Sequence, residues 1–111
     1  MDKTDIDIII NGEIEKVEYI NNLHGITKNN LANYTVSPYK KKFYNPTLNQ
    51  MEEHWVVFDE KQEIEKSGYL IFYSVEDEAF GIGTKTNNKN IEMAGTFIGI
   101  YGSLAETINS M

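Results

Sequence analysis

The residues best suited to acid–base chemistry are two histidines, His24 and His54. His54 follows Glu52 and Glu53 directly, and a histidine beside a carboxylate can serve as a general base or as one ligand of a metal. On a strand, however, neighbouring residues point to opposite faces, and no second histidine is close in sequence. We therefore interpret His54 as a strand-end histidine in a polar environment, and we expect no catalytic and no metal-ligating residues.

A second candidate is the run of three consecutive acids Glu76, Asp77 and Glu78. Calcium binding by an EF-hand loop requires oxygen ligands that alternate around a central glycine, and that pattern is missing. A glycosidase pair would need one carboxyl in an apolar pocket that raises its pKa, whereas these three share one turn. The remaining interpretations are a solvated turn and one end of a charged binding surface.

The other motifs in the sequence do not match a catalytic or cofactor-binding pattern. The stretch GIGTKT, Gly81 to Thr86, lacks the spacing of a phosphate-binding loop, and no dinucleotide fingerprint or nucleophile elbow is present. The run YKKKFY, Tyr39 to Tyr44, mixes lysines with aromatics as some nucleic-acid binders do, but three lysines make a weak phosphate-binding surface in an acidic chain without arginine. We interpret this run as a solvated loop or an edge strand. We expect no cofactor and no enzymatic activity.

Charge is the most informative property of the sequence. The chain has 111 residues, 17 of them acidic and 10 of them lysine, with a net charge of -7. From Glu52 to Glu78 there are nine acids against two lysines, so the entire imbalance lies in this one segment. The charge therefore predicts one strongly acidic surface rather than a uniformly acidic protein.

The elements that must position this charge are predicted from hydrophobic periodicity. Between Asp5 and Ile20, the pair Asn11-Gly12 separates two apolar runs, which is the pattern of a β-hairpin with a type I′ turn. A helix from Glu13 to Leu23 is the alternative, because Ile14 and Val17 would share one helical face. From Asn21 to Gln50, which contains both prolines, we expect loops with a short helix or strand near Leu31 to Val36.

The second half is more regular. Strands are predicted from His54 to Phe58, from Tyr69 to Val75 and around Phe80 to Thr84, with a charged linker at Glu60–Ser67 and a turn at Thr86–Asn90. One or two further strands fit between Asn90 and Tyr101. Both faces of the Tyr69–Val75 strand are apolar, which is typical of a central strand. Gly81 and Gly83 leave one strand face without side chains, which marks close approach of another element.

We expect that element to be a C-terminal helix. Ser103 and Glu106 fit a capping box, and Leu104, Ile108 and Met111 form one apolar stripe. The sequence thus predicts a single α+β domain over residues 1–111, mainly an antiparallel β-sheet with a short C-terminal helix packed on one face.

The sequence also predicts a cytoplasmic protein. No apolar run approaches the roughly 18 residues needed to span a bilayer. The start MDKTDID lacks the basic residues of a signal peptide, and the absence of cysteine suits a reducing compartment.

A compact domain with one acidic edge is suited to meet a cationic partner. Clustered charge accelerates encounter by electrostatic steering, and nearby aromatic side chains can supply desolvated anchors. The predicted partner-binding residues are Asp59, Glu60, Glu63, Glu65, Tyr73, Glu76, Asp77 and Glu78.

A family resemblance agrees with this surface. The order HWVVFDE, GYLIFYSVEDEAFGIGTK and GTFIGIYGSLAETINSM, within residues 54–111, resembles the small immunity proteins of bacterial contact-dependent growth inhibition systems whose toxin is a ribonuclease-like domain. The resemblance implies a non-enzymatic cytoplasmic protein that covers the active site of a cognate cationic toxin nuclease. We expect a monomer in a 1:1 complex, with no direct contact to nucleic acid or membrane. The alternatives are a nucleic-acid-mimicking inhibitor of another nucleic-acid-binding protein and a small enzyme using His54.

Overall fold

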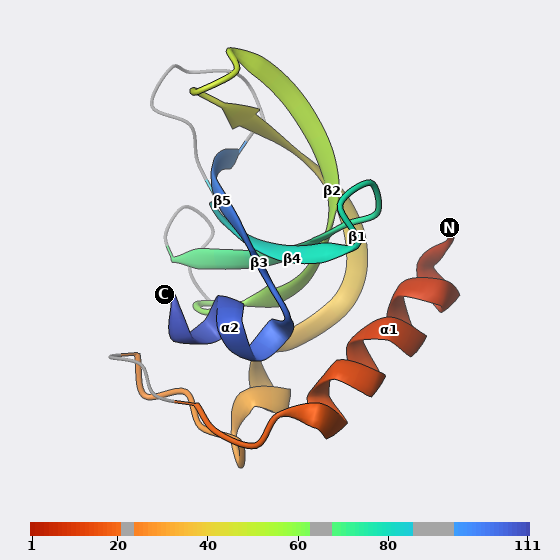
Figure 1. Ribbon diagram of the computed structural model, residues 1–111, viewed down its shortest axis with the longest axis vertical. Helices are drawn as coiled ribbons and strands as arrows, with labels where there is room; N and C mark the ends of the chain where they lie inside the picture. Colours follow the sequence, from red (N-terminus) through yellow and green to blue (C-terminus); the bar gives the residue numbers. More distant parts are fainter. Residues whose placement is uncertain (21–23, 63–67, 86–94) are drawn as a thin grey trace.

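In the computed structural model, which describes residues 1–20, 24–62, 68–85 and 95–111, five strands form a closed barrel flanked by helices at one end (Figure 1). The elements in chain order are α1 (Lys3–Lys16), the 3-10 helix η1 (Leu31–Tyr34), β1 (Thr35–Asn45), β2 (Gln50–Asp59), β3 (Tyr69–Ser74), β4 (Ala79–Thr84), β5 (Gly95–Gly102) and α2 (Leu104–Asn109). The predicted α+β class, with a C-terminal helix on a mainly antiparallel sheet, is confirmed. Closure of the sheet into a barrel was not predicted.

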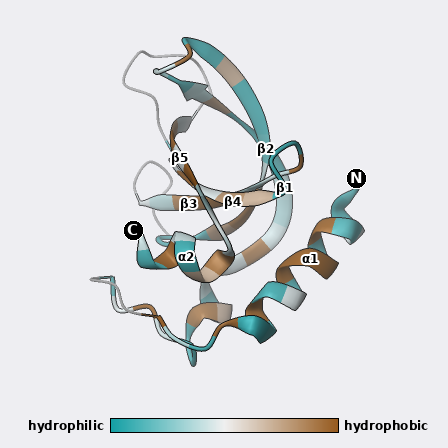
Figure 2. Cartoon of the chain, viewed as in Figure 1, coloured by the Kyte–Doolittle hydropathy of each residue, from teal (hydrophilic) through white to brown (hydrophobic). Residues whose placement is uncertain are grey.

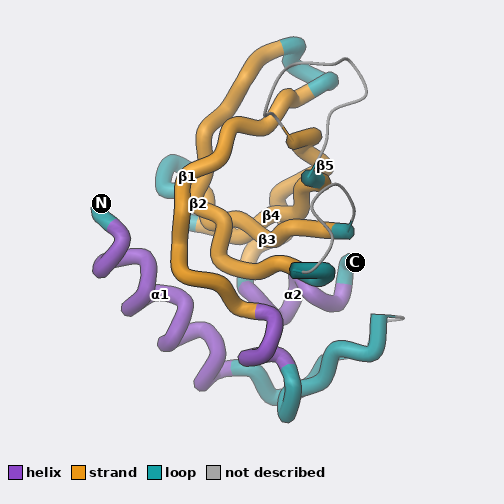
Figure 3. Tube along the Cα trace, turned by 180° about the vertical axis from the view of Figure 1, so that it is seen from behind, coloured by secondary structure: helices purple, strands orange, loops and turns teal. Residues whose placement is uncertain are grey.

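The barrel is a meander whose consecutive strands pair antiparallel. It closes through a short parallel contact between β1 and β5, where Phe43 pairs with Gly95 and Tyr44 with Thr96. The view from behind shows the strands encircling one interior, with α2 below it and α1 running beside its lower half (Figure 3). The β1–β2 hairpin extends away from the helices, and its far end is mostly hydrophilic (Figure 2).

The barrel interior is filled by a small aromatic and aliphatic cluster. Phe43, Val56, Leu70 and Phe72 are fully buried there, with Val36 and Phe97 packed against them. The rings of Phe43 and Phe72 lie 5.0 Å apart between centroids, within the range typical of attractive aromatic pairs.

The prediction that the glycine face of β4 receives a helix is wrong, because aromatic rings inside the barrel occupy the space beside these glycines. A Cβ on Gly81 would meet the Phe72 ring, and one on Gly83 would meet the Phe43 ring, both at 2.5 Å.

The outer side of the barrel carries the larger core, which the helices cover. The buried residues of this core come from both α-helices, the 3-10 helix, the segment between α1 and η1, and strands β2, β3 and β4. They are Ile6, Ile10, Val17, Ile26, Leu31, Val57, Phe58, Ile71, Tyr73, Phe80, Leu104 and Ile108. Helix α2 contacts β4 and β5 through Leu104 and Ile108, on the side of β4 that bears Phe80. Both faces of β3 are therefore covered, as its two apolar faces predicted.

The cap of α2 is also confirmed. Ser103 Oγ accepts a hydrogen bond from the Glu106 backbone at 3.2 Å, and Glu106 Oε1 accepts one from the Ser103 backbone at 3.4 Å. These two bonds satisfy backbone donors that the first helical turn leaves free.

The N-terminal hairpin prediction is wrong, because Lys3–Lys16 is one α-helix. Asp2 and Asp5 form a capping box with two 3.0 Å bonds, and Ile6 and Ile10 bury one face of the helix. Helical spacing places these isoleucines on the outer core, which outweighs the turn preference of Asn11-Gly12. The alternative helix from Glu13 to Leu23 was right only for its first turn, since α1 ends at Lys16 and residues 21–23 lie outside the described residues.

Part of the predicted loop region is a long strand. Thr35–Asn45 forms β1, pairing with β2 along its length and with β5 at its end. The lysine run therefore lies on a strand, where Lys40 and Lys42 are exposed and Lys40 Nζ lies 5.3 Å from the centroid of the Trp55 ring.

The predicted turn at Thr86–Asn90 and most of the Glu60–Ser67 linker lie outside the described residues. Within the described residues, no helix is long and apolar enough to cross a membrane.

Candidate protein-binding groove

A groove of about 520 Å³ opens on the barrel between the two β-turns that join β1 to β2 and β3 to β4. It runs between the β1–β2 turn, the start of β2, the β3–β4 turn and β5. Its lining residues are Asn45, Leu48, Gln50, Met51, Glu52, Glu53, His54, Glu76, Asp77, Phe97 and Ile100. These residues include four acids and no lysine, whereas outside this lining Lys42 lies opposite Glu53 on β1 and Lys40 shares an adjoining pocket with Glu53.

One wall of the groove is the β1–β2 turn, which side-chain hydrogen bonds hold in shape. The buried Asn45 accepts bonds on Oδ1 from the backbone of Thr47 at 3.0 Å and of Leu48 at 3.3 Å. Asn49 adopts a positive φ of 51° and accepts a hydrogen bond from the Tyr44 hydroxyl. The turn therefore presents Leu48, which is 60% exposed, on a fixed backbone.

The opposite wall is the acidic β3–β4 turn. Ser74 Oγ donates to Asp77 Oδ2 at 2.7 Å and accepts from the Asp77 backbone at 3.2 Å. Glu78 takes a positive φ of 50°, which reverses the chain into β4. Glu76 and Asp77 are exposed and line the groove, whereas the exposed Glu78 lies outside its lining.

The floor contains a histidine–carboxylate pair. His54 Nε2 lies 2.9 Å from Glu52 Oε1, and Asn45 Nδ2 donates to Glu52 Oε2 at 2.8 Å. Burial opposes ionisation of Glu52, but bonds from Asn45, His54 and Gln50 outweigh burial and lower its pKa. The His54 ring stacks on Phe72 at 4.4 Å between centroids and is almost fully buried. Glu52 is therefore an ionised group held in place.

The groove combines this charge with exposed apolar surface. Leu48, Met51 and Ile100 all line it and are 60%, 41% and 37% exposed. Apolar side chains next to acids are suited to a partner segment that carries both cationic and apolar side chains. Among the described residues, no group of three or more histidines and acids is placed to hold a metal ion.

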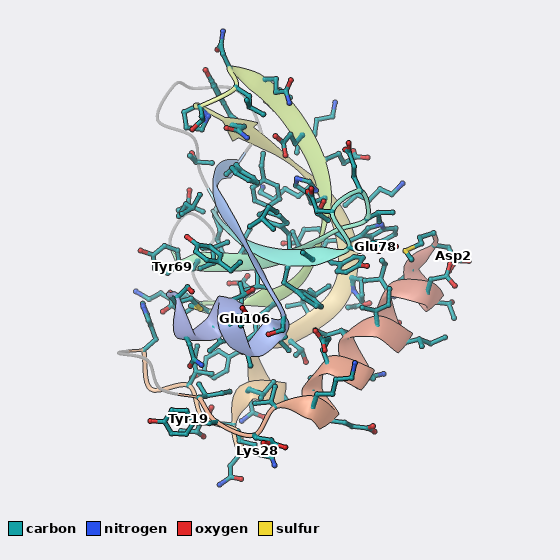
Figure 4. The ribbon with its side chains drawn as sticks, viewed as in Figure 1. Asp2, Tyr19, Lys28, Tyr69, Glu78 and Glu106 are labelled. Carbon is teal, nitrogen blue, oxygen red and sulfur yellow. The ribbon has the colours of Figure 1, made fainter. Side chains whose placement is uncertain are left out.

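The structure divides the predicted partner-binding residues between the two ends of β3. Glu76, Asp77 and Glu78 follow its last residue. Asp59 and Glu60 lie beside its first residues: Asp59 pairs with Leu70, and Glu60 accepts from the Tyr69 backbone at 3.2 Å. Figure 4 shows Tyr69 and Glu78 on opposite sides of the barrel. The predicted residues therefore do not form one continuous patch.

Asp59 and Glu60 are engaged within the protein. Asp59 Oδ1 forms an ion pair with Lys85 Nζ at 2.9 Å, and the side chains are only 12% and 8% exposed. Glu60 pairs with His24, and its side chain is 10% exposed. The structure thus gives both acids internal roles at the end of the barrel away from the groove.

Tyr73 lies in the outer core, where it is 6% exposed and packs edge-on against Phe80 at 5.1 Å. Burial, with Glu78 and Glu13 nearby, raises the pKa of its hydroxyl. The position of Tyr73 is that of a core residue. Glu63 and Glu65 lie outside the described residues.

Glu52 and Glu53 were not among the predicted site residues, although they belong to the acidic segment. Strand β2 pairs antiparallel with β3 so that Trp55 lies opposite Tyr73. Strand β3 ends at Ser74, so the start of β2 extends beyond the paired residues on the side where the β3–β4 turn lies. The sequence signal that could have found Glu52 and Glu53 is their place at the start of the acidic segment Glu52–Glu78.

Comparisons of this chain with protein-family models, with curated proteins and with solved structures find no match.

Proposed function

We propose that this protein is a binding module that neutralises a cationic protein partner through its acidic groove. The resemblance of residues 54–111 to immunity proteins supports, as the proposed partner, the nuclease toxin domain of a contact-dependent growth inhibition system. In this proposal the protein acts in the cytoplasm, carries no enzymatic activity and forms a 1:1 complex.

The observation that carries the proposal is the placement of four acids, two from the start of β2 and two from the β3–β4 turn, in a groove whose lining has no lysine. Of these acids, Glu53 and Glu76 are exposed, and no hydrogen bond or ion pair ties their side chains to another described residue. A nuclease that binds phosphate presents a positive field over its active site. An acidic surface placed there competes with nucleic acid for that field and raises the rate of encounter.

His54 and Glu52 favour a second candidate, an acid–base enzyme, because they form a hydrogen-bonded pair on the groove floor. The stacking of His54 on Phe72 and the bonds of Glu52 to Asn45 also explain both residues as supports of the barrel end. His54→Gln separates the two functions. A binding module with this substitution still protects against the toxin, whereas an enzyme that depends on the imidazole loses its activity.

The direct experiment uses the neighbouring gene. If the open reading frame upstream encodes a large secreted protein, its C-terminal domain is purified and mixed with this protein. We expect a 1:1 complex by light scattering and loss of nuclease activity at equimolar protein. A toxin domain that cleaves RNA equally well with and without this protein would refute the proposal.

A further inference from the structure

One edge of β5 is only partly used to close the barrel. β5 pairs with β4 from Thr96 to Gly102, but its contact with β1 covers Gly95 and Thr96 alone. No strand in the described part of the chain pairs with the second edge of β5 from Phe97 to Gly102. Along such an edge, alternate residues direct their backbone N–H and C=O groups toward the position of a further strand.

The side chains of this edge do not protect it. Strand β5 has the sequence GTFIGIYG, which contains no charged residue and no proline. Ile98 and Ile100 are 45% and 37% exposed on it. Natural edge strands are usually protected by lysine, proline or a covering element, so an uncharged apolar edge is suited to accept another strand.

The charge beside this edge identifies the strand that it accepts. Phe97 and Ile100 line the groove together with Glu52, Glu53, Glu76 and Asp77. A second copy of this chain would bring its own acids against these four, and like charges at an interface cost several kcal/mol. A segment with lysine or arginine on one face and apolar side chains on the other matches the acids on the groove side and the exposed Ile98, which is not part of the groove lining.

We propose that the Phe97–Gly102 edge of β5 pairs with an extended segment of the partner in which cationic and apolar residues alternate. This inference rests on the proposed function and states how the partner is held. The new strand adds backbone hydrogen bonds to β5, its cationic side chains meet the groove acids on the side that Ile100 lines, and its apolar side chains cover Ile98. Backbone bonds then supply affinity while alternate side chains supply specificity.

The test is amide hydrogen exchange of the labelled protein, read at Phe97–Gly102. The probes are a peptide that alternates lysine and valine over seven residues, its glutamate–valine counterpart, and the toxin domain encoded upstream. We expect the lysine peptide and the toxin domain to slow exchange at alternate β5 amides by at least about tenfold, and the glutamate peptide to have no effect. Exchange that neither the lysine peptide nor the toxin domain slows would overturn the inference.

Other occupants give distinguishable results. Slow exchange in the free protein at every concentration means that another segment of this chain covers the edge. Protection that rises with protein concentration means that a second copy covers it. Either result overturns the inference.

The matched variants are Ile98→Lys with Ile100→Lys on the edge, and Ile8→Lys on α1, where the isoleucine is 67% exposed. The edge variant should weaken binding of the lysine peptide at least about tenfold, because lysine repels the probe and blocks the edge. The α1 variant should not change it. Equal binding by the edge variant would count against the inference, and the exchange experiment on the parent stands if the variant fails to fold.

The two proposals fail separately. If the toxin domain is inhibited but leaves β5 exchange unchanged, the binding function stands and the edge assignment fails. If the toxin domain does not bind while the lysine peptide protects β5, the edge assignment stands and the immunity function fails.

Discussion

Gly83 of β4 leaves the space that the ring of Phe43 of β1 occupies inside the barrel. A Cβ on Gly83 would lie 2.5 Å from Cε1 of this ring and 3.1 Å from the backbone oxygen of Thr96. The fully buried ring has little room to move, so Gly83→Ala should destabilise the protein by about 1–3 kcal/mol. Urea unfolding followed by tryptophan fluorescence measures this change. Unchanged stability would mean that the ring does not fill the barrel as described.

The same substitution should have the opposite effect in α1. Gly12 is inside a helix, and a Cβ there would meet nothing within 4 Å. Gly12→Ala should therefore stabilise the protein by about 0.5–1 kcal/mol, because glycine is a poor helix former. Loss of stability would instead indicate the positive φ of a hairpin turn, and so would contradict the helix.

The ion pair between Asp59 and Lys85 predicts a large loss of stability when its cation is removed. Lys85→Met leaves the Asp59 carboxylate buried without its cation, which typically costs about 3–5 kcal/mol. Lys16→Met is the control, since Lys16 is 79% exposed and lies 3.8 Å from Glu13. This control should change the free energy of unfolding by less than about 1 kcal/mol. Similar losses in both variants would show that the Asp59–Lys85 pair is not buried.

Glu52 predicts a pH dependence of stability. Its folded pKa lies below its ordinary value of 4.5, so the ionised form stabilises the folded protein above that pH. This contribution should be lost as the pH falls through the lowered folded pKa. The difference in unfolding free energy between the parent and Glu52→Gln should be largest above pH 4.5 and shrink in more acidic solution. A difference that grows on acidification would contradict the lowered pKa.

The second half of the fold could be predicted because its local signals agree with its tertiary contacts. Strands β3 and β4 alternate as expected, and the Ser103–Glu106 capping box begins α2. The first half could not. Asn11-Gly12 is a strong turn signal, and the helix forms because Ile6 and Ile10 are buried against elements distant in sequence and Asp2 and Asp5 cap its first turn.

Barrel closure and the groove depend on long-range pairing that no local pattern reveals. Lys41, Phe43 and Asn45 share one face of strand β1, and this face mixes charged, apolar and polar residues. The sequence therefore lacks the apolar alternation that predicts a strand. The parallel contact of Phe43 with Gly95 joins the first and last strands of the meander, which are far apart in the sequence. The charge of the acidic segment was visible in the sequence. The structure was required to show that Asp59 and Glu60 contact Lys85 and His24 inside the protein, whereas Glu53 and Glu76 lie at the open groove.

The most direct test of the central claim is the association rate of the upstream-encoded toxin domain with Glu53→Lys/Glu76→Lys across a series of salt concentrations. The control is Glu15→Lys/Glu18→Lys, which makes the same charge change at exposed acids outside the groove. The account predicts that the groove variant associates at least about tenfold more slowly at low salt and loses most of its salt dependence, while the control stays near the parent rate. Equal slowing of both variants, or parent-like association by the groove variant, would contradict it.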